Sequence, residues 1–245
     1  MEETAQTVAL VTGGAVRIGA AICRRLASAD ILVVIHYRTS SSQAEALRQE
    51  IVAAGGQALT IQADLHSAES CAELIERAWY KCGRLNYLVN NAGVFRRDAV
   101  TDFVIEQALE QVWLNAWAPL ILTREFAQRC PTGGAVVNLL DRRIHGLDRT
   151  YFSYGISKRL LENFTYICAL EYAPSVRINA VAPGAILPPR QPGGEPAPPA
   201  GAAPLGLHPS PDDIADAVYF LLTRTCITGQ VVFVDGGQHL HGQIF

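Results

Sequence analysis

Short, nearly uninterrupted apolar runs alternate with longer segments of helical periodicity along the whole chain. Apolar runs without alternating polar positions are typical of strands buried on both faces of a parallel sheet. The predicted strands are Val8–Thr12, Ile31–Ile35, Ala58–Gln62, Leu85–Asn90, Ala135–Leu140, Arg177–Val181 and Val231–Asp235. The predicted helices cover residues 18–29, 41–54, 67–81, 101–129, 152–172 and 210–222. This alternation predicts an α/β fold, a single doubly wound domain with a seven-stranded parallel sheet, helices on both faces and right-handed crossovers.

No repeat or linker divides the sequence, so residues 1–245 are expected to form one Rossmann-type domain. The exception to its regular pattern is the segment 187–206, which is dense in proline, glycine and alanine. Such a composition cannot build a core, and it predicts a flexible loop at the carboxyl edge of the sheet that shapes substrate choice. The next helix restarts with Ser210 as its cap, Pro211 in its first turn and Asp213 completing a capping box.

Composition narrows the class of protein. The chain has 49% hydrophobic and 18% charged residues, as a well-buried globular protein does, and its net charge of −3 provides no basic field for nucleic acid. No apolar run approaches the roughly 20 residues of a membrane span, and the acidic N-terminus does not resemble a secretory signal. The cysteines lack metal-site spacing, which predicts buried, reduced thiols in a cytoplasmic protein without a metal. They are Cys23, Cys71, Cys82, Cys130, Cys168 and Cys226.

The first strand leads into a glycine turn and a helix start, the arrangement that binds a pyrophosphate through backbone amides. Gly13 and Gly19 let the chain approach a dinucleotide closely, and Ile18 belongs to the same turn. Arg17 stands at the middle position, where the fingerprint usually has glycine. We expect its guanidinium near the cofactor phosphates and the substrate; the alternative is a solvated arginine at a helix start.

The end of the second strand indicates which nicotinamide cofactor binds. An acidic residue at this point would hold a ribose 2′-hydroxyl and repel a 2′-phosphate. The chain instead has His36, Tyr37, Arg38 and Ser40, with no carboxylate among them. This group predicts a 2′-phosphate pocket and therefore NADPH as the cofactor.

Further cofactor contacts are expected where strands three and four end. Asp64 is placed to meet the adenine, and Leu65 follows it. Asn91, Ala92 and Gly93 come directly after strand four, where small residues leave room for the cofactor ribose. Both groups therefore enter the predicted cofactor site.

The candidate catalytic residues follow the fifth strand. Tyr154 and Lys158 stand four apart, so both side chains leave the same face of a helix. An ammonium beside a phenol lowers the tyrosine pKa, as a proton donor near neutral pH requires. Such a pair alone is weak, but here it follows a strand that ends in Asp141. Asn115 is expected to hold a water that feeds the lysine, or else to be a satisfied core amide.

Together these motifs resemble the short-chain dehydrogenase/reductase family over essentially the whole chain. The resemblance rests on Thr12-Gly13 with Gly19, Asn90–Gly93, Asn115, Tyr154 with Lys158, Pro183-Gly184 and Val234–Gly237. It implies hydride transfer from a nicotinamide, Tyr154 as the acid and Lys158 as its tuner and ribose ligand. It also implies cofactor contacts by Pro183 and Gly184, and a homotetramer.

One departure narrows the resemblance. The family's usual active-site serine is absent, and Asp141 occupies its region. With Arg17 and the His-Tyr-Arg run, this departure resembles the pteridine reductases, which include trypanosomatid enzymes and bacterial dihydromonapterin reductases. Phe95 falls where those enzymes stack their pterin, so Arg17, Phe95, Asp141 and Tyr154 are the expected substrate residues. Gly93 differs from the trypanosomatid enzymes, which have a serine there that hydrogen-bonds the pterin.

The sequence thus predicts NADPH-dependent reduction of a dihydropterin (dihydrobiopterin, dihydromonapterin or related, possibly dihydrofolate) to its tetrahydro form. A 3-oxoacyl or other carbonyl reductase is the alternative, with Ser153 or a loop residue replacing the missing serine. A third interpretation is an inactive NADPH-binding protein, in which Phe95 would be a core aromatic. Such a protein would have no reason to retain Asn115, Tyr154 and Lys158 together.

Overall fold

The computed structural model describes residues 6–130, 133–186 and 203–241. Its described strands form one parallel sheet of seven strands in the order β3-β2-β1-β4-β5-β6-β7. The strands are β1 Val8–Val11, β2 Leu32–Tyr37, β3 Ala58–Gln62, β4 Tyr87–Asn90, β5 Gly134–Leu139, β6 Val176–Pro183 and β7 Val231–Val234. The order reverses at β1, which pairs with both β2 and β4, so the predicted doubly wound fold is confirmed.

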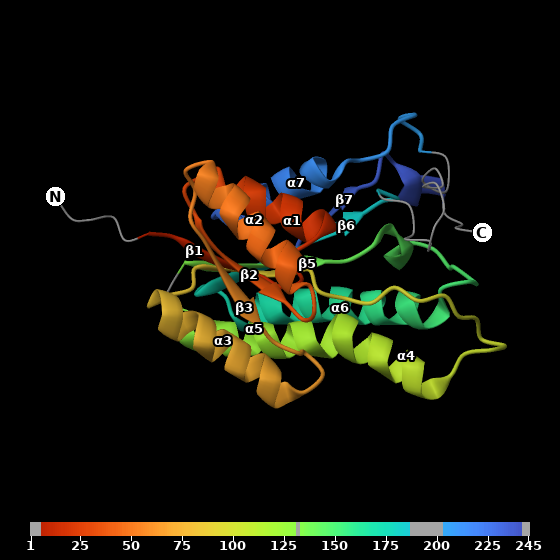
Figure 1. The fold of residues 1–245 in the computed structure, drawn as a ribbon. Helices are drawn as coiled ribbons and strands as arrows, with labels where there is room; N and C mark the ends of the chain where they lie inside the picture. The colour runs from red at the N-terminus through yellow and green to blue at the C-terminus, as the bar shows by residue number, and fades with distance from the viewer. Residues whose placement is uncertain (1–5, 131–132, 187–202, 242–245) are drawn as a thin grey trace.

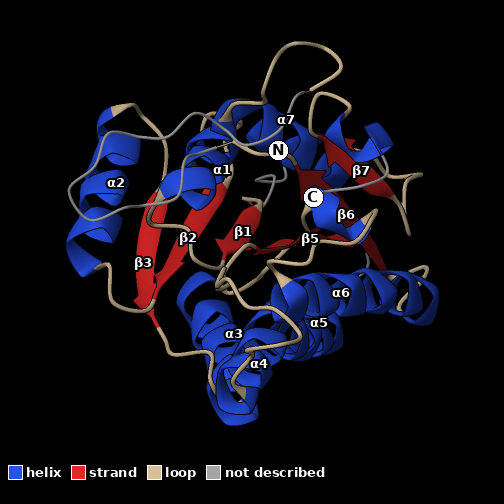
Figure 2. Ribbon diagram, turned by 90° about the vertical axis from the view of Figure 1, so that its right-hand side faces the viewer, coloured by secondary structure: helices blue, strands red, loops and turns tan. Residues whose placement is uncertain are grey.

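Helices cover both faces of this sheet. The helices are α1 Arg17–Ala27, α2 Ser41–Ala53, α3 Ala68–Cys82, α4 Ile105–Val112, α5 Ala118–Arg129, α6 Phe152–Glu171 and α7 Pro211–Thr223. Helices α1, α2 and α7 lie on one face, and α3 to α6 lie on the other (Figures 1 and 2). No described helix is long and apolar enough to span a membrane.

The continuous apolar runs are explained by the two cores. In β1, Ala9 and Val11 belong to the cluster under α1, α2 and α7, whereas Val8 and Leu10 belong to the cluster under α3 and α5. Each of these side chains is at most 2% exposed. Because neighbouring residues of a strand face opposite layers, both parities must be apolar, and each large side chain contributes about 1.5–3 kcal/mol by burial.

The prediction of one continuous helix over residues 101–129 is wrong. Helix α4 begins at Ile105, a π-turn covers Trp113–Trp117, and α5 begins at Ala118. Pro119 lies in the first turn of α5, where its missing N–H and its ring prevent regular bonding to the preceding turn. The π-turn accommodates this proline, and it places Asn115 in a widened turn of the kind common at functional sites.

The predicted start of α7 is confirmed. The Ser210 hydroxyl accepts from the Asp213 amide at 3.2 Å, and the Asp213 carboxylate accepts from the Ser210 amide at 2.7 Å. Pro211 occupies the first helical position. Of the predicted loop 187–206, residues 187–202 lie outside the described residues.

All six cysteines are free thiols, as expected. Burial raises the pKa of Cys71 to about 12, so its thiolate is suppressed. The prediction that the cysteines are buried is wrong for Cys226, which is exposed, and Cys82 and Cys130 are only partly buried.

Candidate active site

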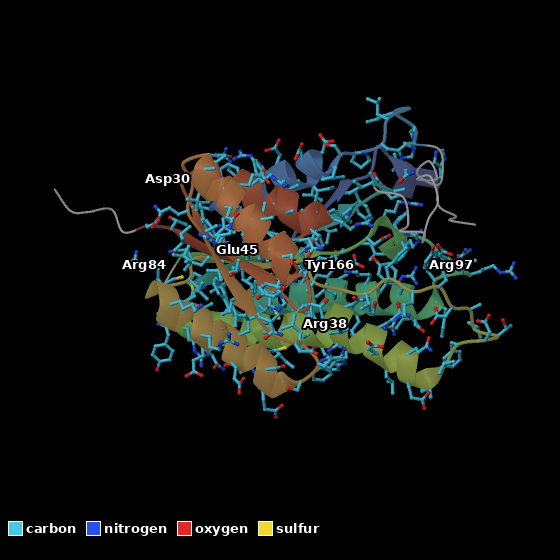
Figure 3. The ribbon with its side chains drawn as sticks, in the orientation of Figure 1. Asp30, Arg38, Glu45, Arg84, Arg97 and Tyr166 are labelled. Atoms are coloured by element: carbon cyan, nitrogen blue, oxygen red, sulfur yellow. The ribbon has the colours of Figure 1, made fainter. Side chains whose placement is uncertain are left out.

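The candidate residues gather at the carboxyl edge of the sheet. Figure 3 separates the two edges: Asp30 and Arg84, which precede β2 and β4, lie at the left, and Arg97, which follows β4, lies at the right. Ligands of doubly wound sheets bind at the carboxyl edge, next to the strand where the order reverses. The turn after β1 and the segments after β4 and β5 meet at this place.

The glycine turn after β1 is supported from behind by His36. The Gly13 amide donates to His36 Nδ1 at 3.1 Å, and His36 Nε2 lies 3.2 Å from the Ala63 carbonyl. Burial lowers the pKa of His36 to about 4, so the imidazole is neutral and donates from Nε2. The prediction that His36 lines a phosphate pocket is therefore wrong, because its ring is 2% exposed and both nitrogens are engaged within the protein.

The turn is also locked to the end of β4. The Thr12 hydroxyl accepts from the amides of Asn91 and Ala92, each at 3.0 Å. Asn91 Nδ2 donates to the carbonyls of Thr12 and Gly13 at 2.9 and 3.0 Å. A Cβ on Gly19 would lie 2.3 Å from the Gly13 carbonyl, so only glycine fits there. The small residues predicted for cofactor access are thus also required by the packing of the turn itself.

Arg17 adopts the backbone conformation that glycine would adopt at its position. It is exposed, it begins α1, and its φ is +55°, in the left-handed region. A residue with a side chain pays roughly 1–2 kcal/mol there. Backbone strain of this kind concentrates at functional sites, so its presence in the segment that follows Gly13 supports a role for the guanidinium.

The residues after β2 and β3 form the other end of the predicted cofactor site. Arg38 is exposed, and no ion pair joins it to a carboxylate within the described ranges. Tyr37 and Ser40 beside it are partly exposed. The Asp64 carboxylate is bonded to His66, and this bond lowers its pKa. Leu65 is buried, so its side chain is not available to a ligand.

Tyr154 and Asp141 form a direct hydrogen bond. The Tyr154 hydroxyl donates to Asp141 Oδ2 at 3.1 Å, and Tyr154 is 7% exposed. Burial, and then the Asp141 charge, raise the pKa of Tyr154 well above its ordinary value. The phenol therefore holds its proton, as a proton donor must before it acts.

Lys158 is fixed to the end of β5. Its Nζ donates to the Leu139 carbonyl at 2.7 Å and lies 5.7 Å from the centre of the Tyr154 ring. Burial lowers the pKa of Lys158 to about 8. The expectation that Lys158 lowers the pKa of Tyr154 is wrong in this structure, because burial of the phenol and the nearby Asp141 charge dominate.

Asn115 joins the segment after β4 to α6. Its Oδ1 accepts from the Val94 amide at 2.8 Å, and its Nδ2 donates to the Val94 carbonyl at 2.9 Å and to Ser157 Oγ at 3.0 Å. Both amide hydrogens are used, so the satisfied core amide weighed as the alternative describes this side chain. A Cβ on Gly93 would lie 2.7 Å from Asn115 Oδ1, so a serine at 93 requires Asn115 to move.

A group of aromatic side chains lies beside Tyr154 and Asp141. Phe95 is 47% exposed, stacks on Tyr151 at 4.4 Å between ring centres, and meets the Tyr154 ring edge-on at 4.6 Å. Phe95 thus lies next to Tyr154 and is not a core aromatic, and its role as a substrate wall stays a prediction. Tyr151 was not singled out from the sequence, where nothing distinguishes it from any residue before a helix.

Two neighbours of Asp141 also escaped the sequence analysis as site residues. Arg143 bonds to the Asp141 carboxylate, and Arg142 is 5% exposed with a buried Nε that has no hydrogen-bond partner among the described residues. Burial lowers the pKa of Arg142. Ser153, the candidate replacement for the missing serine, is 2% exposed. Its buried hydroxyl is not presented to a substrate.

The last predicted cofactor contacts lie after β6. Pro183 ends this strand, and the Gly184 amide donates to the Val234 carbonyl at 2.9 Å. A Cβ on Gly184 would lie 2.7 Å from Asp235 Cα, so the close approach of β6 and the end of β7 requires glycine. Contact of either residue with a cofactor stays a prediction, as does that of Ile18.

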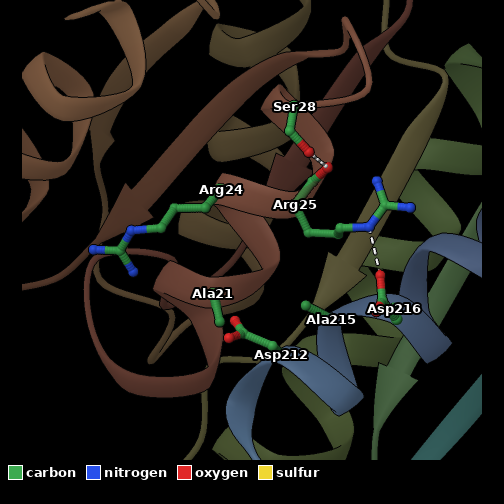
Figure 4. Close-up of a pocket in the computed structure, with 7 residues that line it drawn as sticks. All are labelled: Ala21, Arg24, Arg25, Ser28, Asp212, Ala215 and Asp216. Atoms are coloured by element: carbon green, nitrogen blue, oxygen red, sulfur yellow. Dashed lines mark hydrogen bonds and ion pairs between the residues drawn. The ribbon is translucent and has the colours of Figure 1, made fainter. Parts of the chain in front are cut away.

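Two cavities lie outside this group. One of about 240 Å³ lies between α1 and α7 (Figure 4), and its arginines are paired with carboxylates, Arg24 with Glu50 at 2.6 Å and Arg25 with Asp216 at 2.5 Å. The other, of about 400 Å³, lies beside Trp113 and Trp117. Neither contains a predicted catalytic residue.

Comparison with known proteins agrees with this geometry. The family described as enoyl-(acyl carrier protein) reductase matches residues 14–239. FolM alternative dihydrofolate reductase 1 from Brucella canis, solved with NADP, is 35% identical, with a TM-score of 0.89 and coverage of 96% of this chain and 95% of that chain. A 3-oxoacyl-[acyl-carrier-protein] reductase from Synechocystis is 33% identical over 242 residues, covering 96% and 97% of the two chains. Pteridine reductase 1 from Leishmania tarentolae is 30% identical over 278 residues, covering 95% and 96%. The chain belongs to the short-chain dehydrogenase/reductase family of oxidoreductases.

Proposed function

We propose that this protein is an NADPH-dependent reductase that converts a dihydropterin to its tetrahydro form. The observation that carries the proposal is the hydrogen bond of 3.1 Å from Tyr154 to Asp141, with Phe95 directly beside it. A proton donor, a carboxylate and an aromatic side chain that is 47% exposed together suit a flat, nitrogen-rich ring. The relatives from Brucella canis and Leishmania tarentolae, a dihydrofolate reductase and a pteridine reductase by name, support it.

The described residues fit NADPH. The turn at Gly13 and Gly19 has the close packing that a pyrophosphate-binding turn needs. Arg38 follows β2, and no ion pair fixes its guanidinium among the described residues, so its charge is available to a 2′-phosphate, with Tyr37 and Ser40 beside it. The Brucella canis relative was solved in complex with NADP, which supports the same choice here.

When bound, NADPH supplies the hydride, and the protein supplies the proton and the orientation. Tyr154 holds that proton because burial keeps the phenol neutral, and its hydroxyl hydrogen points to Asp141 Oδ2. Asp141 can accept hydrogen bonds from the amino and ring N–H groups of a pterin. Lys158, anchored to the Leu139 carbonyl, is placed to bind a ribose hydroxyl. Phe95 provides a stacking face for the ring.

The residue at position 141 distinguishes dihydropterin reduction from carbonyl reduction. Reduction of a carbonyl develops negative charge on oxygen, and such a site works through donors aimed at that oxygen. The carboxylate of Asp141 would repel that charge. A pterin, in contrast, offers donors to this carboxylate and takes a proton on nitrogen. The chemistry of the site therefore favours a pterin.

A carbonyl reductase of the 3-oxoacyl type is the second candidate. It is favoured by the Synechocystis relative, which carries that name and is 33% identical. Against it stand Asp141 and the burial of Ser153, which has 2% exposure. An inactive NADPH-binding protein fits less well, because such a protein would have no reason to hold Tyr154 against Asp141 with Lys158 beside it.

Self-association as a homotetramer is part of the proposal. Helices α4 and α6 pack together, and with the π-turn Trp113–Trp117 they expose large apolar side chains that a monomer would leave in water. These are Ile105, Leu109, Trp117, Ile167 and Leu170, which are 43–83% exposed.

The free cysteines fit a reducing compartment such as the cytoplasm.

The test is NADPH oxidation measured side by side with dihydrobiopterin, dihydromonapterin, dihydrofolate and a β-ketoester. We expect turnover of at least one dihydropterin to exceed that of the ketoester by tenfold or more, on the order of 1.4 kcal/mol in transition-state binding. Turnover of the ketoester alone would assign the protein to the carbonyl reductases. Oxidation with none of them would favour the NADPH-binding protein.

A further inference from the structure

We propose that Arg143 is a positioning residue, which holds the Asp141 carboxylate in the orientation that meets Tyr154. The inference rests on the proposed function, because it assumes that Asp141 and Tyr154 act together on the substrate. Arg143 itself is not assigned contact with the substrate. Its effect on the reaction passes through Asp141.

Arg143 bonds to Asp141 in two ways. Its backbone amide donates to Asp141 Oδ1 at 2.9 Å, and its Nη1 donates to both carboxylate oxygens at 3.3 Å. Asp141 is the residue before the 3-10 turn Arg142–Ile144, so the turn itself brings the amide to Oδ1. The guanidinium and the amide both bond Oδ1, and Oδ2 remains turned toward the Tyr154 hydroxyl at 3.1 Å.

A second carboxylate holds the guanidinium in place. Arg143 Nε donates to Asp148 Oδ2 at 2.8 Å. Asp148 Oδ1 accepts from the amide and the hydroxyl of Thr150 at 2.9 and 2.8 Å. Burial opposes ionisation of Asp148, but these bonds outweigh it and keep the pKa of its carboxyl below the usual value. The chain Asp148–Arg143–Asp141–Tyr154 is thus a connected network of charge-assisted hydrogen bonds.

The same guanidinium contacts the aromatic group. Its Cζ lies 4.6 Å from the centre of the Tyr151 ring and 5.3 Å from that of Phe95. The Arg143 side chain is 14% exposed, so these contacts form out of bulk water. Arg143 therefore fixes the Asp141 carboxylate relative to the rings of Phe95 and Tyr151.

This arrangement predicts a loss of orientation when the guanidinium is removed. The Asp141 side chain then keeps only two of its described bonds, from the Arg143 backbone amide and from the Tyr154 hydroxyl, and it can rotate away from Tyr154. Misplacement of a reacting group by about 1 Å costs on the order of 100-fold in rate. Cofactor binding does not pass through this network and stays unaffected.

The test is a double-mutant cycle of Arg143→Met and Asp141→Asn, with kcat measured for the substrate that the parent enzyme reduces fastest. We expect Arg143→Met to lower kcat by about 10- to 100-fold, with the Kd for NADPH unchanged within about twofold. In the Asp141→Asn background the same change should cost less than about threefold, because the charged carboxylate that Arg143 positions is gone. Arg143→Lys should recover part of the loss.

Arg97→Met is the matched control. Arg97 also lies over the Tyr151 ring, at 5.7 Å, but no hydrogen bond joins it to Asp141 in the described part of the chain. We expect its kcat to stay within about twofold of the parent. An equal loss in Arg97→Met would show that charge near the ring, and not positioning, is responsible.

Two outcomes overturn the inference independently of the proposed function. One is full additivity in the cycle, which is measurable even when the best substrate is a ketone. The other is a crystal structure of Arg143→Met in which the Tyr154–Asp141 hydrogen bond is unchanged, and this readout requires no substrate. Failure of the proposed function is different, because it appears in the parent enzyme as absence of dihydropterin turnover.

Discussion

The buried Lys158 predicts an unusual dependence of stability on pH. Burial lowers its pKa from 10.5 to about 8, so the folded protein must hold a costly buried ammonium below that pH. The difference of about 2.5 pKa units corresponds to roughly 3 kcal/mol at about 1.4 kcal/mol each. Below pH 8, Lys158 is protonated in both the folded and the unfolded chain. The folded protein is then destabilised by the full free energy of burying the ammonium. Between pH 8 and 10.5 the unfolded chain binds more protons, so the contribution of Lys158 to stability improves as pH rises.

The perturbation is Lys158→Met, which keeps the stem and removes the charge. Urea unfolding of the cofactor-free parent and variant should give a difference in the free energy of unfolding that favours the variant near neutral pH. That advantage should shrink by about 2 kcal/mol between about pH 7 and 9.5, as the parent loses its buried charge. Lys158→Arg is the control, because a guanidinium keeps its charge throughout this range. A difference between parent and Lys158→Met that does not change with pH would refute the reasoning.

Three further substitutions test the site. Arg38→Asp should reverse the preference for NADPH over NADH by a few kcal/mol, the scale of at least one lost charge-assisted bond, as read from the two Kd values; equal affinities in the parent would contradict the assignment. Tyr154→Phe should remove most of kcat while NADPH still binds, which stopped-flow turnover and fluorescence titration can separate; ordinary turnover would exclude Tyr154 as the donor. Asp141→Ser should depress dihydropterin reduction and raise any activity on ketones, measured as the ratio of kcat/KM values; an unchanged ratio would remove Asp141 from substrate choice.

The fold could be predicted because its strands are buried on both faces. Where every position of a short run is apolar, as in Val8–Val11, only a parallel sheet with two helical layers accommodates the pattern. The break in the helix 101–129 also left a signal, since Pro119 stands inside an otherwise continuous helical run. The helical periodicity continues across this proline, so periodicity alone predicts an unbroken helix.

The site was predictable in its residue types and less so in their roles. His36 ends a strand where a ligand residue is expected, but whether such a ring faces solvent or supports the Gly13 turn depends on packing against Ala63, far away in the sequence. The pKa of Tyr154 was expected to follow its neighbour Lys158. It follows burial instead, a property of the whole fold that spacing along one helix does not contain.

The position of Arg143 beside Asp141 also could not be predicted from the sequence. It stands two residues from Asp141 in the sequence, in a run of charged residues that would usually be solvated. The 3-10 turn after β5 brings its guanidinium back over the carboxylate, and Asp148 and Tyr151 help to hold it there. A carboxylate in place of the common serine needs such support, because a serine hydroxyl can rotate to suit its partner, whereas the two oxygens of Asp141 must be held. In the proposed function, the carboxylate of Asp141 and the guanidinium of Arg143 therefore act as one unit.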